Sequence, residues 1–490
     1  MSVLIVVNDP KKWPFDIPGV DVVDARSYLT KPEFSERRNV KVFNLCRSYA
    51  YQSTGYYVSL LAQARGHKPL PSISSLQDMK SQAIVRLVSD DLDDLIQKCL
   101  APIQSERFTL SVYFGRNMAK RYDKLALQLF NLFQSPLMRA QFVKDKKWLL
   151  RSVTTIAGSE VPITHRDFVV QVATEHFKGR VSRVRRPAPT RYDMAILTNP
   201  AEAVPPSDEK AIKKFIKAAE SMGIAVEMIT RDDYGRLAEF DALFIRETTQ
   251  VNHHTYRFSR RAAGEGLVVI DDPESIVRCT NKVYLAELLT RHHVPIPKTT
   301  LVHKDNADII IPELGLPCVL KKPDSAFSLG VIKVDTPEQL QTELQRFLDD
   351  SELVVAQEFL PTTFDWRIGI IDQRPLFACK YFMAKKHWQI INHEDSDGKA
   401  KYGKFETLPV ELAPPKAVRA ALKAANLIGN GLYGVDVKQS GDNFYVIEVN
   451  DNPNLDSGVE DAILKDELYR RIMSVFLSRI EQRKAGFLSV

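Results

Sequence analysis

The sequence predicts an α/β protein of several domains, and three observations support this fold class. The chain has 490 residues, of which 44% are hydrophobic and 26% are charged, an ordinary globular composition for about two to four domains. Short apolar strands alternate with amphipathic helices up to residue 271, which is typical of small, mostly parallel sheets. After residue 271 strands and helices mix and a hairpin signal appears, which indicates a larger α+β domain.

Residues 1–178 are expected to form an N-terminal α/β domain. The apolar runs Ser2–Val7 and Val40–Leu45 predict strands, and the periodicity of Lys124–Phe133 and Phe168–Phe177 predicts amphipathic helices. None of these segments points to a particular chemistry, so the role of this region is left open.

A linker is predicted over residues 179–190. The stretch GRVSRVRRPAPTR, residues 179–191, holds five arginines and two prolines and little that could be buried. A solvated connection is the simpler interpretation, and a surface for an anionic partner is the alternative.

The next region, residues 191–271, predicts a second small α/β domain. Its four short strands are Asp193–Leu197, Ile224–Ile229, Ala242–Ile245 and Leu267–Ile270. Ser207 is placed to cap the helix after the first strand, because its hydroxyl can accept a hydrogen bond from a free backbone N–H. Ile212, Phe215 and Ala219 lie at helical spacing and give that helix an apolar face.

Residues 272–490 carry the most specific chemical signal, a hairpin with polar groups inside apolar strands. Glu448 and Asn450 are two residues apart on one strand and so share a face, and Asp436 lies on the preceding strand. Cross-strand neighbours are close enough to share a ligand, and carboxylate and amide oxygens are donors that magnesium prefers. A metal site is therefore favoured over the alternative, an ordinary hairpin with a wet polar face.

Two lysine motifs suggest phosphate binding. Lys282 begins an amphipathic helix, where the helix N-terminus and the ammonium group can address the same anion. A strand ending in Lys321 and Lys322 leads into a loop of small residues that includes Ser325 and Gly330, whose backbone N–H groups can face phosphates. Because neighbouring strand residues point to opposite faces, only one of the two adjacent lysines is expected to enter a binding site.

A further segment lies between the lysine motifs and the hairpin. An apolar strand ends in Gln357 and Glu358 and is followed by Leu360, and a segment that joins two lobes can offer backbone groups to an adenine edge. Asp365 and Arg367 then share one strand face, where a structural Asp–Arg pair is an equal alternative to a functional one. The sequence has no GxxxxGK[ST] P-loop and no GxGxxG after a strand, so nucleotide binding requires another scaffold.

Taken in this order, the motifs resemble the ATP-grasp superfamily, and specifically its RimK-like carboxylate–amine ligases. The resemblance covers residues 191–480, with Glu448-Val-Asn-Asp-Asn-Pro as its most specific stretch. It implies a pre-ATP-grasp α/β domain at 191–271 and an α+β ATP-grasp domain at 272–490. Residues 1–178 are similar to the accessory domain found ahead of some RimK-like ATP-grasp domains.

The resemblance also implies roles for single residues. The nucleotide would be bound by Lys282, Lys321, Ser325, Gly330, Gln357, Glu358, Leu360 and Asp365. The spacing to Gly330 favours Lys321 over Lys322. The metal ligands would be Asp436, Glu448 and Asn450. The catalytic candidates, which would bind the carboxylate or a developing oxyanion, are Arg246, Arg367 and Lys380, each with surface solvation as its alternative.

The implied reaction consumes ATP with Mg²⁺ or Mn²⁺ and forms an amide through an acyl phosphate. A carboxylate donor is phosphorylated, and an amine acceptor, which can be an amino acid, a peptide, a protein or a small amine, then displaces phosphate. Residues 380–404 hold six lysines against three acidic residues, which suggests an anionic substrate such as glutamate or an acidic peptide. A solvated loop accounts for these lysines equally well.

Two other function classes remain as alternatives. One is a catalytically inactive nucleotide-binding module with an interaction role, and the other is a small-molecule phosphotransferase. The intact trio of metal ligands argues against the inactive module, because buried polar groups are costly to keep. ATP turnover that depends on added amine would separate the ligase from both.

Charge, cysteine content and hydropathy limit the expected partners. A net charge of +6 suits anionic substrates but does not by itself indicate nucleic acid. No apolar run reaches the length of a membrane span, and the N-terminus reads as a strand instead of a signal peptide. The five cysteines form no CxxC pair, which is typical of reduced thiols in a cytoplasmic protein; a homo-oligomer is left open.

Overall fold

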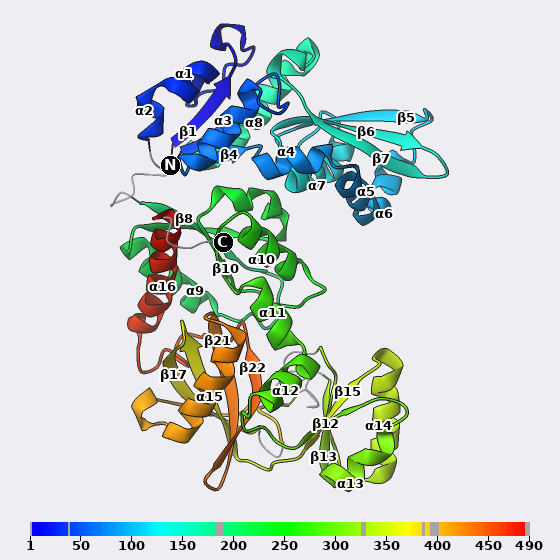
Figure 1. Ribbon diagram of the computed structural model, residues 1–490, viewed down its shortest axis with the longest axis vertical. Coiled ribbons are helices and arrows are strands. Elements are labelled where there is room, and N and C mark those ends of the chain that lie inside the picture. The colour runs from blue at the N-terminus through cyan, green and yellow to red at the C-terminus, as the bar shows by residue number, and fades with distance from the viewer. Residues whose placement is uncertain are drawn as a thin grey trace. The chain divides into compact units, whose positions relative to one another are not determined.

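A computed structural model shows the chain as sheets covered by helices (Figure 1). The described residues are 2–37, 40–181, 190–324, 330–384, 388–392 and 401–485. The chain divides into two compact units, one formed by Met1–Tyr192 with Asp232–Glu239 and the other by Asp193–Arg231 with Phe240–Val490. Both units mix strands and helices, so the protein has the α/β fold class that the sequence predicts.

The first unit contains a four-stranded parallel sheet with the order β2-β1-β3-β4. Its strands are β1 (Ser2–Val7), β2 (Asp21–Asp24), β3 (Val40–Asn44) and β4 (Lys68–Leu70). Leu4 and Val6 of β1 pack in one apolar core, whereas Ile5 and Val7 pack in another. A sheet buried on both faces requires such continuous apolar strands. The helices nearby are α1 (Ala25–Thr30), α2 (Pro32–Ser35), α3 (Thr54–Ala64) and α8 (Arg166–Val181).

An antiparallel sheet with the order β5-β6-β7 completes this unit. Its strands are β5 (Arg107–Tyr113), β6 (Leu137–Lys144) and β7 (Trp148–Thr155). Val112, Ala140 and Leu150 of these strands share one core, which buries a single face of the sheet. The helices of this half are α4 (Ile73–Lys80), α5 (Gln82–Asp91), α6 (Asp93–Leu100) and α7 (Asp123–Phe133). Helix α7 is among the predicted elements, whereas the sheet is not.

The second unit begins with a four-stranded sheet, β11-β10-β8-β9, in which β10 pairs in parallel with both neighbours. Its strands are β8 (Tyr192–Leu197), β9 (Ile224–Ile229), β10 (Ala242–Ile245) and β11 (Val268–Ile270), each within one residue of the prediction. Helices α9 (Glu209–Ser221), α10 (His254–Gly264) and α16 (Asp466–Lys484) pack around it. The predicted cap of α9 is wrong by one residue: Asp208 accepts the N–H of Ala211, while Ser207 donates to the carbonyl of Leu455.

Two antiparallel sheets follow in the second unit, with the orders β12-β15-β13-β14 and β20-β17-β16-β21-β22. The smaller sheet contains β12 (Thr299–Val302), β13 (Cys318–Lys321), β14 (Val331–Val334) and β15 (Val354–Glu358), with α13 (Ile310–Leu314) and α14 (Pro337–Asp350). The larger sheet contains β16 (Phe364–Ile371), β17 (Arg374–Phe382), β20 (Phe405–Leu408), β21 (Leu432–Ser440) and β22 (Asn443–Asn450). Residues 359–363 connect the two sheets directly.

The larger sheet has one apolar face and one polar face. Helix α15 (Pro415–Ile428) lies across the apolar face, where it packs on residues such as Ile368, Val435 and Val449 (Figure 1). Strand alternation sends the residues between them to the opposite face, which carries Asp436 and Glu448. Helices α11 (Pro273–Thr280) and α12 (Lys282–Arg291) precede this region, and a short ladder joins β18 (Ile391–Asn392) to β19 (Lys401–Tyr402).

Helix α8 extends into the range that the sequence predicts as a linker. Helix α8 continues to Val181, so the first residues of the range 179–190 are helical, and residues 182–189 lie outside the described part of the chain. The division into four domains stays a prediction. None of the described helices is both long enough and apolar enough to span a membrane.

Candidate active site

The polar face of the β21–β22 hairpin brings the three predicted metal ligands together. Asp436 and Glu448 are direct register partners, and Asn450 follows two residues later on the same face, opposite Gly434. The amide of Asn450 donates to Oδ2 of Asp436 over 3.3 Å and to the carbonyl of Gly434 over 3.2 Å. The three side chains therefore form one cluster of oxygen-bearing groups.

Each carboxylate of this cluster is paired with a cation of the chain. Arg367 on β16 donates from Nε to Oδ1 of Asp436 over 2.5 Å and from Nη2 to Oδ2 over 2.8 Å. Such a bidentate pair fixes both groups in one orientation. Lys282, the first residue of α12, places its Nζ 3.2 Å from Oε1 of Glu448. Without such partners, buried carboxylates would be strongly destabilising.

The two carboxyl groups differ in pKa because their surroundings differ. Burial raises the pKa of Asp436, although Arg367 opposes that effect. Burial would also raise the pKa of Glu448, but the ammonium groups of Lys282 and Lys321 outweigh it and hold the pKa below its ordinary value. Glu448 is thus the carboxylate that the surrounding cations keep charged.

The donor set of the hairpin fits a hard divalent cation. Two carboxylates and one amide oxygen are the kind of ligands that magnesium takes, and the trio itself contains no thiol or imidazole. Asp436, Glu448 and Asn450 would hold such an ion in place of the pairs that Asp436 and Glu448 make with Arg367 and Lys282.

Lys321 and Lys322 diverge as strand alternation predicts. Lys321 is buried, and its Nζ donates to Oε1 of Gln357 over 2.7 Å. Lys322 instead donates to Asp350 at the surface over 2.6 Å. Of these two lysines, Lys321 therefore points into the interior and Lys322 points to the surface.

Burial has a large effect on Lys321. It lowers the pKa of the ammonium group to about 8, with Glu448 opposing the shift and Lys282 adding to it. The charges of Glu448 and Lys282 thus both act on the ammonium group of Lys321. Lys282, Lys321 and Asp436 are buried, and Glu448 beside Lys282 is half-buried.

The small-residue loop after Lys322 is only partly described. Ser325 lies outside the described residues. Gly330, at the far end of the loop, has a φ of +80°, a left-handed conformation that favours glycine. Its carbonyl accepts the N–H of Lys322 over 2.8 Å, which closes the base of the loop.

The predicted adenine-binding segment lies at the connection between the two antiparallel sheets. The amide nitrogen of Gln357 donates to the hydroxyl of Thr299 over 2.8 Å. Glu358 pairs with Lys298 twice, because its N–H donates to the Lys298 carbonyl over 2.9 Å and its Oε1 accepts the Lys298 N–H over 2.8 Å. Leu360 follows in the half-buried connection. The side chains of Gln357 and Glu358 therefore join the end of β15 to Lys298 and Thr299.

Asp365 and Arg367 share a strand face but do not pair with each other. Oδ1 of Asp365 accepts Nζ of Lys438 over 2.7 Å and the hydroxyl of Thr362 over 2.9 Å. Arg367 pairs with Asp436 on the same neighbouring strand as Lys438. The alternative of a structural Asp365–Arg367 pair is therefore wrong, because each residue joins an opposite charge on β21.

Two family models match this chain. The model of the RimK-like ATPgrasp N-terminal domain matches residues 25–172, and the model of the ATP-grasp domain matches residues 279–454. The second match contains both lysines, the connection and the hairpin cluster. The chain is a RimK-like ATP-grasp ligase. Ligases of this family form C–N bonds with ATP and magnesium.

Several named proteins are similar to this ATP-grasp ligase. A "Probable alpha-L-glutamate ligase" of Thioalkalivibrio sulfidiphilus is 27% identical over 230 residues, covering 46% of this chain and 73% of that protein. One of Marinomonas sp. is 23% identical over 296 residues, covering 56% and 92%. The solved D-alanine–D-alanine ligase from Bacillus anthracis has a TM-score of 0.46 and 16% identity, covering 60% of this chain and 99% of that one.

Arg246 of the ligase is not presented to a substrate. It is fully buried, and its guanidinium donates to the hydroxyl of Ser207, to Oδ1 of Asn452 and to the carbonyls of Pro206 and Pro453. A guanidinium has five N–H donors, and these contacts use most of them inside the chain. Arg246 therefore joins the ends of two loops, and its catalytic role stays a prediction.

Lys380 of the ligase lies on the other face of the large sheet from Arg367. It pairs in register with Trp366, its Nζ lies 5.2 Å from the centre of that ring, and it donates to Glu406 over 3.0 Å. Strand alternation places it on the face opposite Asp436. The predicted catalytic role of Lys380 is therefore not supported by its position.

Two groups beside the cluster of the ligase are not among the residues predicted from the sequence. Lys438 lies two residues after Asp436 on the same strand, so period-two spacing could have identified it. Tyr381 donates its hydroxyl to Glu460, and its ring lies 5.3 Å from the guanidinium carbon of Arg367. Burial raises the pKa of Glu460 to about 7. No local pattern could have identified this pair, because it joins residues far apart in sequence.

Proposed function

We propose that this ATP-grasp ligase activates an amino-acid carboxylate and joins it to an amine, with glutamate as the first substrate to test. The relatives named as probable alpha-L-glutamate ligases support glutamate. The reaction would phosphorylate the carboxylate with the γ-phosphoryl group of ATP, and the amine would then displace phosphate and form the amide. Mn²⁺ is a second candidate ion, because it takes the same oxygen donors as Mg²⁺. We also place the reaction in the cytoplasm.

The observation that supports this proposal most strongly is the grouping of two lysines with the oxygen donors of the hairpin. Lys282 and Lys321 would bind the phosphates, since both carry ammonium groups beside Glu448. Asp436, Glu448 and Asn450 would hold the divalent ion, which supplies Lewis-acid stabilisation of the phosphate oxygens when bound.

Arg367 and the connection between the sheets would position the substrates. Arg367 lies beside Asp436, and once an ion takes its place at that carboxylate its guanidinium could orient an acyl oxygen. The backbone near Leu360 would face the adenine, while Glu358 and Gln357 hold the strand end in place. Asp365 would act through Lys438.

A screen for amine-dependent phosphate release tests this function. Wild-type protein with ATP and Mg²⁺ is offered glutamate with a panel of amino acids, peptides and small amines, and products are identified by mass spectrometry. We expect phosphate release only with acid and amine together, and an amide product. Asp436→Asn should be inactive, whereas Glu411→Gln, an exposed carboxylate outside the cluster, should match the wild type. Phosphate transfer to a substrate that needs no amine would favour a phosphotransferase and contradict the proposal.

A further inference from the structure

A group of side chains that could bind a metal ion lies at the carboxyl ends of the parallel strands β8 and β10. The last residues of these strands, Leu197 and Ile245, are register partners, so the loops that follow them leave the sheet side by side. The chain continues from β8 to β9 on one side, whereas β10 lies on the other side of β8. In open α/β sheets, such a change of direction between two parallel strands is the usual place for a ligand.

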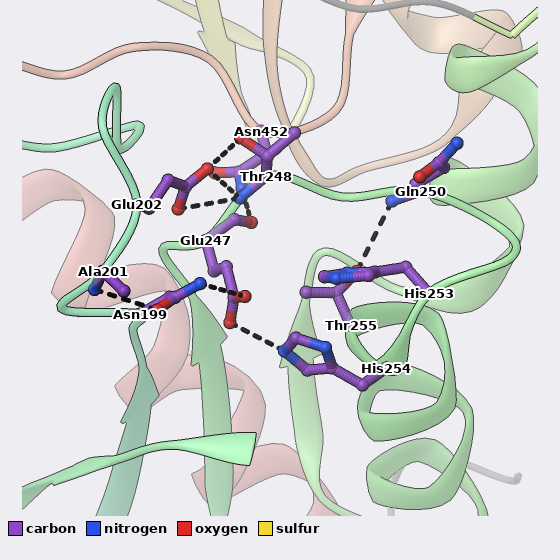
Figure 2. A network of polar contacts seen from close by, with 10 residues as sticks. All are labelled: Asn199, Ala201, Glu202, Glu247, Thr248, Gln250, His253, His254, Thr255 and Asn452. Carbon is purple, nitrogen blue, oxygen red and sulfur yellow. Dashed lines mark hydrogen bonds and ion pairs between the residues drawn. The ribbon is translucent and has the colours of Figure 1, made fainter.

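Three side chains of the β10 loop and helix α10 converge at this position (Figure 2). Glu247, His253 and His254 each offer one ligand atom, and these atoms all lie within 4.8 Å of one another. Nε2 of His254 lies 2.9 Å from Oε2 of Glu247, and the two imidazole rings have centroids 3.9 Å apart. Neighbouring ligands of a tetrahedral zinc ion are about 3.3 Å apart, given bonds of about 2.0–2.1 Å. Only a small side-chain movement would therefore bring all three onto one ion.

Two further residues orient these side chains. Nδ1 of His253 lies 3.1 Å from the hydroxyl of Thr255, which also accepts the N–H of Gln250. The amide of Asn199 donates to Oε1 of Glu247 over 3.2 Å, which leaves Oε2 turned toward His254. Metal-binding histidines and carboxylates are usually held by such hydrogen bonds on the atom that does not bind the metal.

Two carboxylates lie at this position. Glu247 is buried, and Glu202 of the β8 loop lies nearby, where it accepts the N–H of Thr248 over 3.1 Å (Figure 2). Burial raises the pKa of Glu202, and the charge of Glu247 adds a smaller rise. The alternative to a metal site is a simple hydrogen-bonded pair of Glu247 and His254, which accounts for two of the three side chains. It does not explain why His253 stacks beside them.

We propose that Glu247, His253 and His254 form a binding site for one divalent transition-metal ion, with zinc as the first candidate. Two imidazoles and one carboxylate are the ligands of sites that bind zinc or related first-row ions and leave a coordination position open. This site differs in chemistry from the Asp436, Glu448 and Asn450 cluster, which has oxygen donors alone. Asn452, two residues after Asn450, donates to the carbonyl of Glu247 over 2.7 Å and so links the loop to the end of β22.

Zinc titration of the tag-free chain tests this site. The chain is first freed of metal with a chelator and then titrated with zinc by calorimetry. The titration contains no nucleotide, and excess Mg²⁺ occupies the Asp436, Glu448 and Asn450 cluster. We expect one zinc ion per wild-type chain. Binding should be at least about 100-fold weaker in Glu247→Gln and His254→Ala, and about tenfold weaker in Thr255→Val, which removes only an orienting hydroxyl. Exposed His292 supplies the matched control, because His292→Ala should bind zinc like the wild type.

Two further measurements separate this site from the proposed reaction. Cobalt should give a visible absorption band typical of histidine coordination in the wild type and in Asp436→Asn, and lose it in His254→Ala. Circular dichroism checks that each variant is folded, and His253→Ala replaces any that is not. The proposal is overturned if the wild type binds no stoichiometric zinc, if His254→Ala and His253→Ala bind as tightly as the wild type, or if Asp436→Asn alone abolishes binding. A failure of ligase activity would leave the zinc result unchanged.

Discussion

The two antiparallel sheets of the second unit contribute opposite charges to one region. The smaller sheet supplies Lys321, whose pKa burial lowers, and the larger sheet supplies Asp436, whose pKa burial raises. Both groups are buried, yet the lysine is held by the neutral amide of Gln357, whereas the aspartate is held by the charged Arg367. The buried cation of the smaller sheet, Lys321, is therefore available to an anionic ligand. The buried anion of the larger sheet, Asp436, already has a cationic partner.

Removing a carboxylate of the larger sheet should have the largest effect. Glu448→Ala is expected to lower ATP turnover by at least about 1,000-fold at ordinary magnesium, because it deletes a predicted ion ligand. Phosphate release under saturating ATP measures this, with circular dichroism as the check on folding. Turnover near the wild-type rate would show that the cluster does not hold the catalytic ion.

Breaking the charge pair of the larger sheet should also reduce the stability of the fold. Arg367→Ala leaves Asp436 buried without its bidentate partner, so we expect a loss of about 3 kcal/mol in the free energy of unfolding. Urea denaturation measures the change. Arg374→Ala, an exposed arginine of the neighbouring strand, is the matched control and should change stability by less than about 0.5 kcal/mol. Equal effects of the two substitutions would contradict the assigned pair.

The smaller sheet is tested by its two adjacent lysines. Lys321→Ala should weaken ATP binding about 30-fold, because it removes a buried cation close to Glu448. Lys322→Ala should change affinity by less than about twofold, since that side chain pairs with Asp350 at the surface. A nucleotide titration by calorimetry compares them, and a reversed order would mean that the strand register is wrong.

The smallest expected effect is a pH dependence of ATP binding that arises from Lys321. With a pKa of about 8, its ammonium group is mostly charged at pH 7 and mostly neutral at pH 9. ATP affinity should therefore fall up to about tenfold as the pH rises across this range. Lys321→Arg, which stays protonated, should flatten the profile. If the wild-type profile is already flat, the pKa of Lys321 in the free protein is not lowered.

The features that the sequence predicts well are those that depend on local spacing. Strand alternation alone places Glu448 beside Asn450 and separates Lys321 from Lys322, and the structure has both arrangements. The strands β8, β9, β10 and β11 are likewise predicted from short apolar runs.

The features that the sequence does not predict depend on register between distant strands. Arg367 meets Asp436 instead of Asp365 because β16 pairs with β21, and Lys380 turns away because it lies opposite Trp366. Strands β5 and β6 are separated by the helix α7, so their pairing has no local signature. The convergence of Glu247 with His254 similarly requires the fold of the β10 loop.

Two ion pairs, Asp436 with Arg367 and Glu448 with Lys282, have a consequence for folding in the absence of ligands. A newly synthesised chain carries its own counter-ions for the groups that would otherwise repel each other in the interior. Folding of this sheet therefore does not have to wait for nucleotide or metal in the cell. Ligand supply would then control when the enzyme works, and not whether it is assembled.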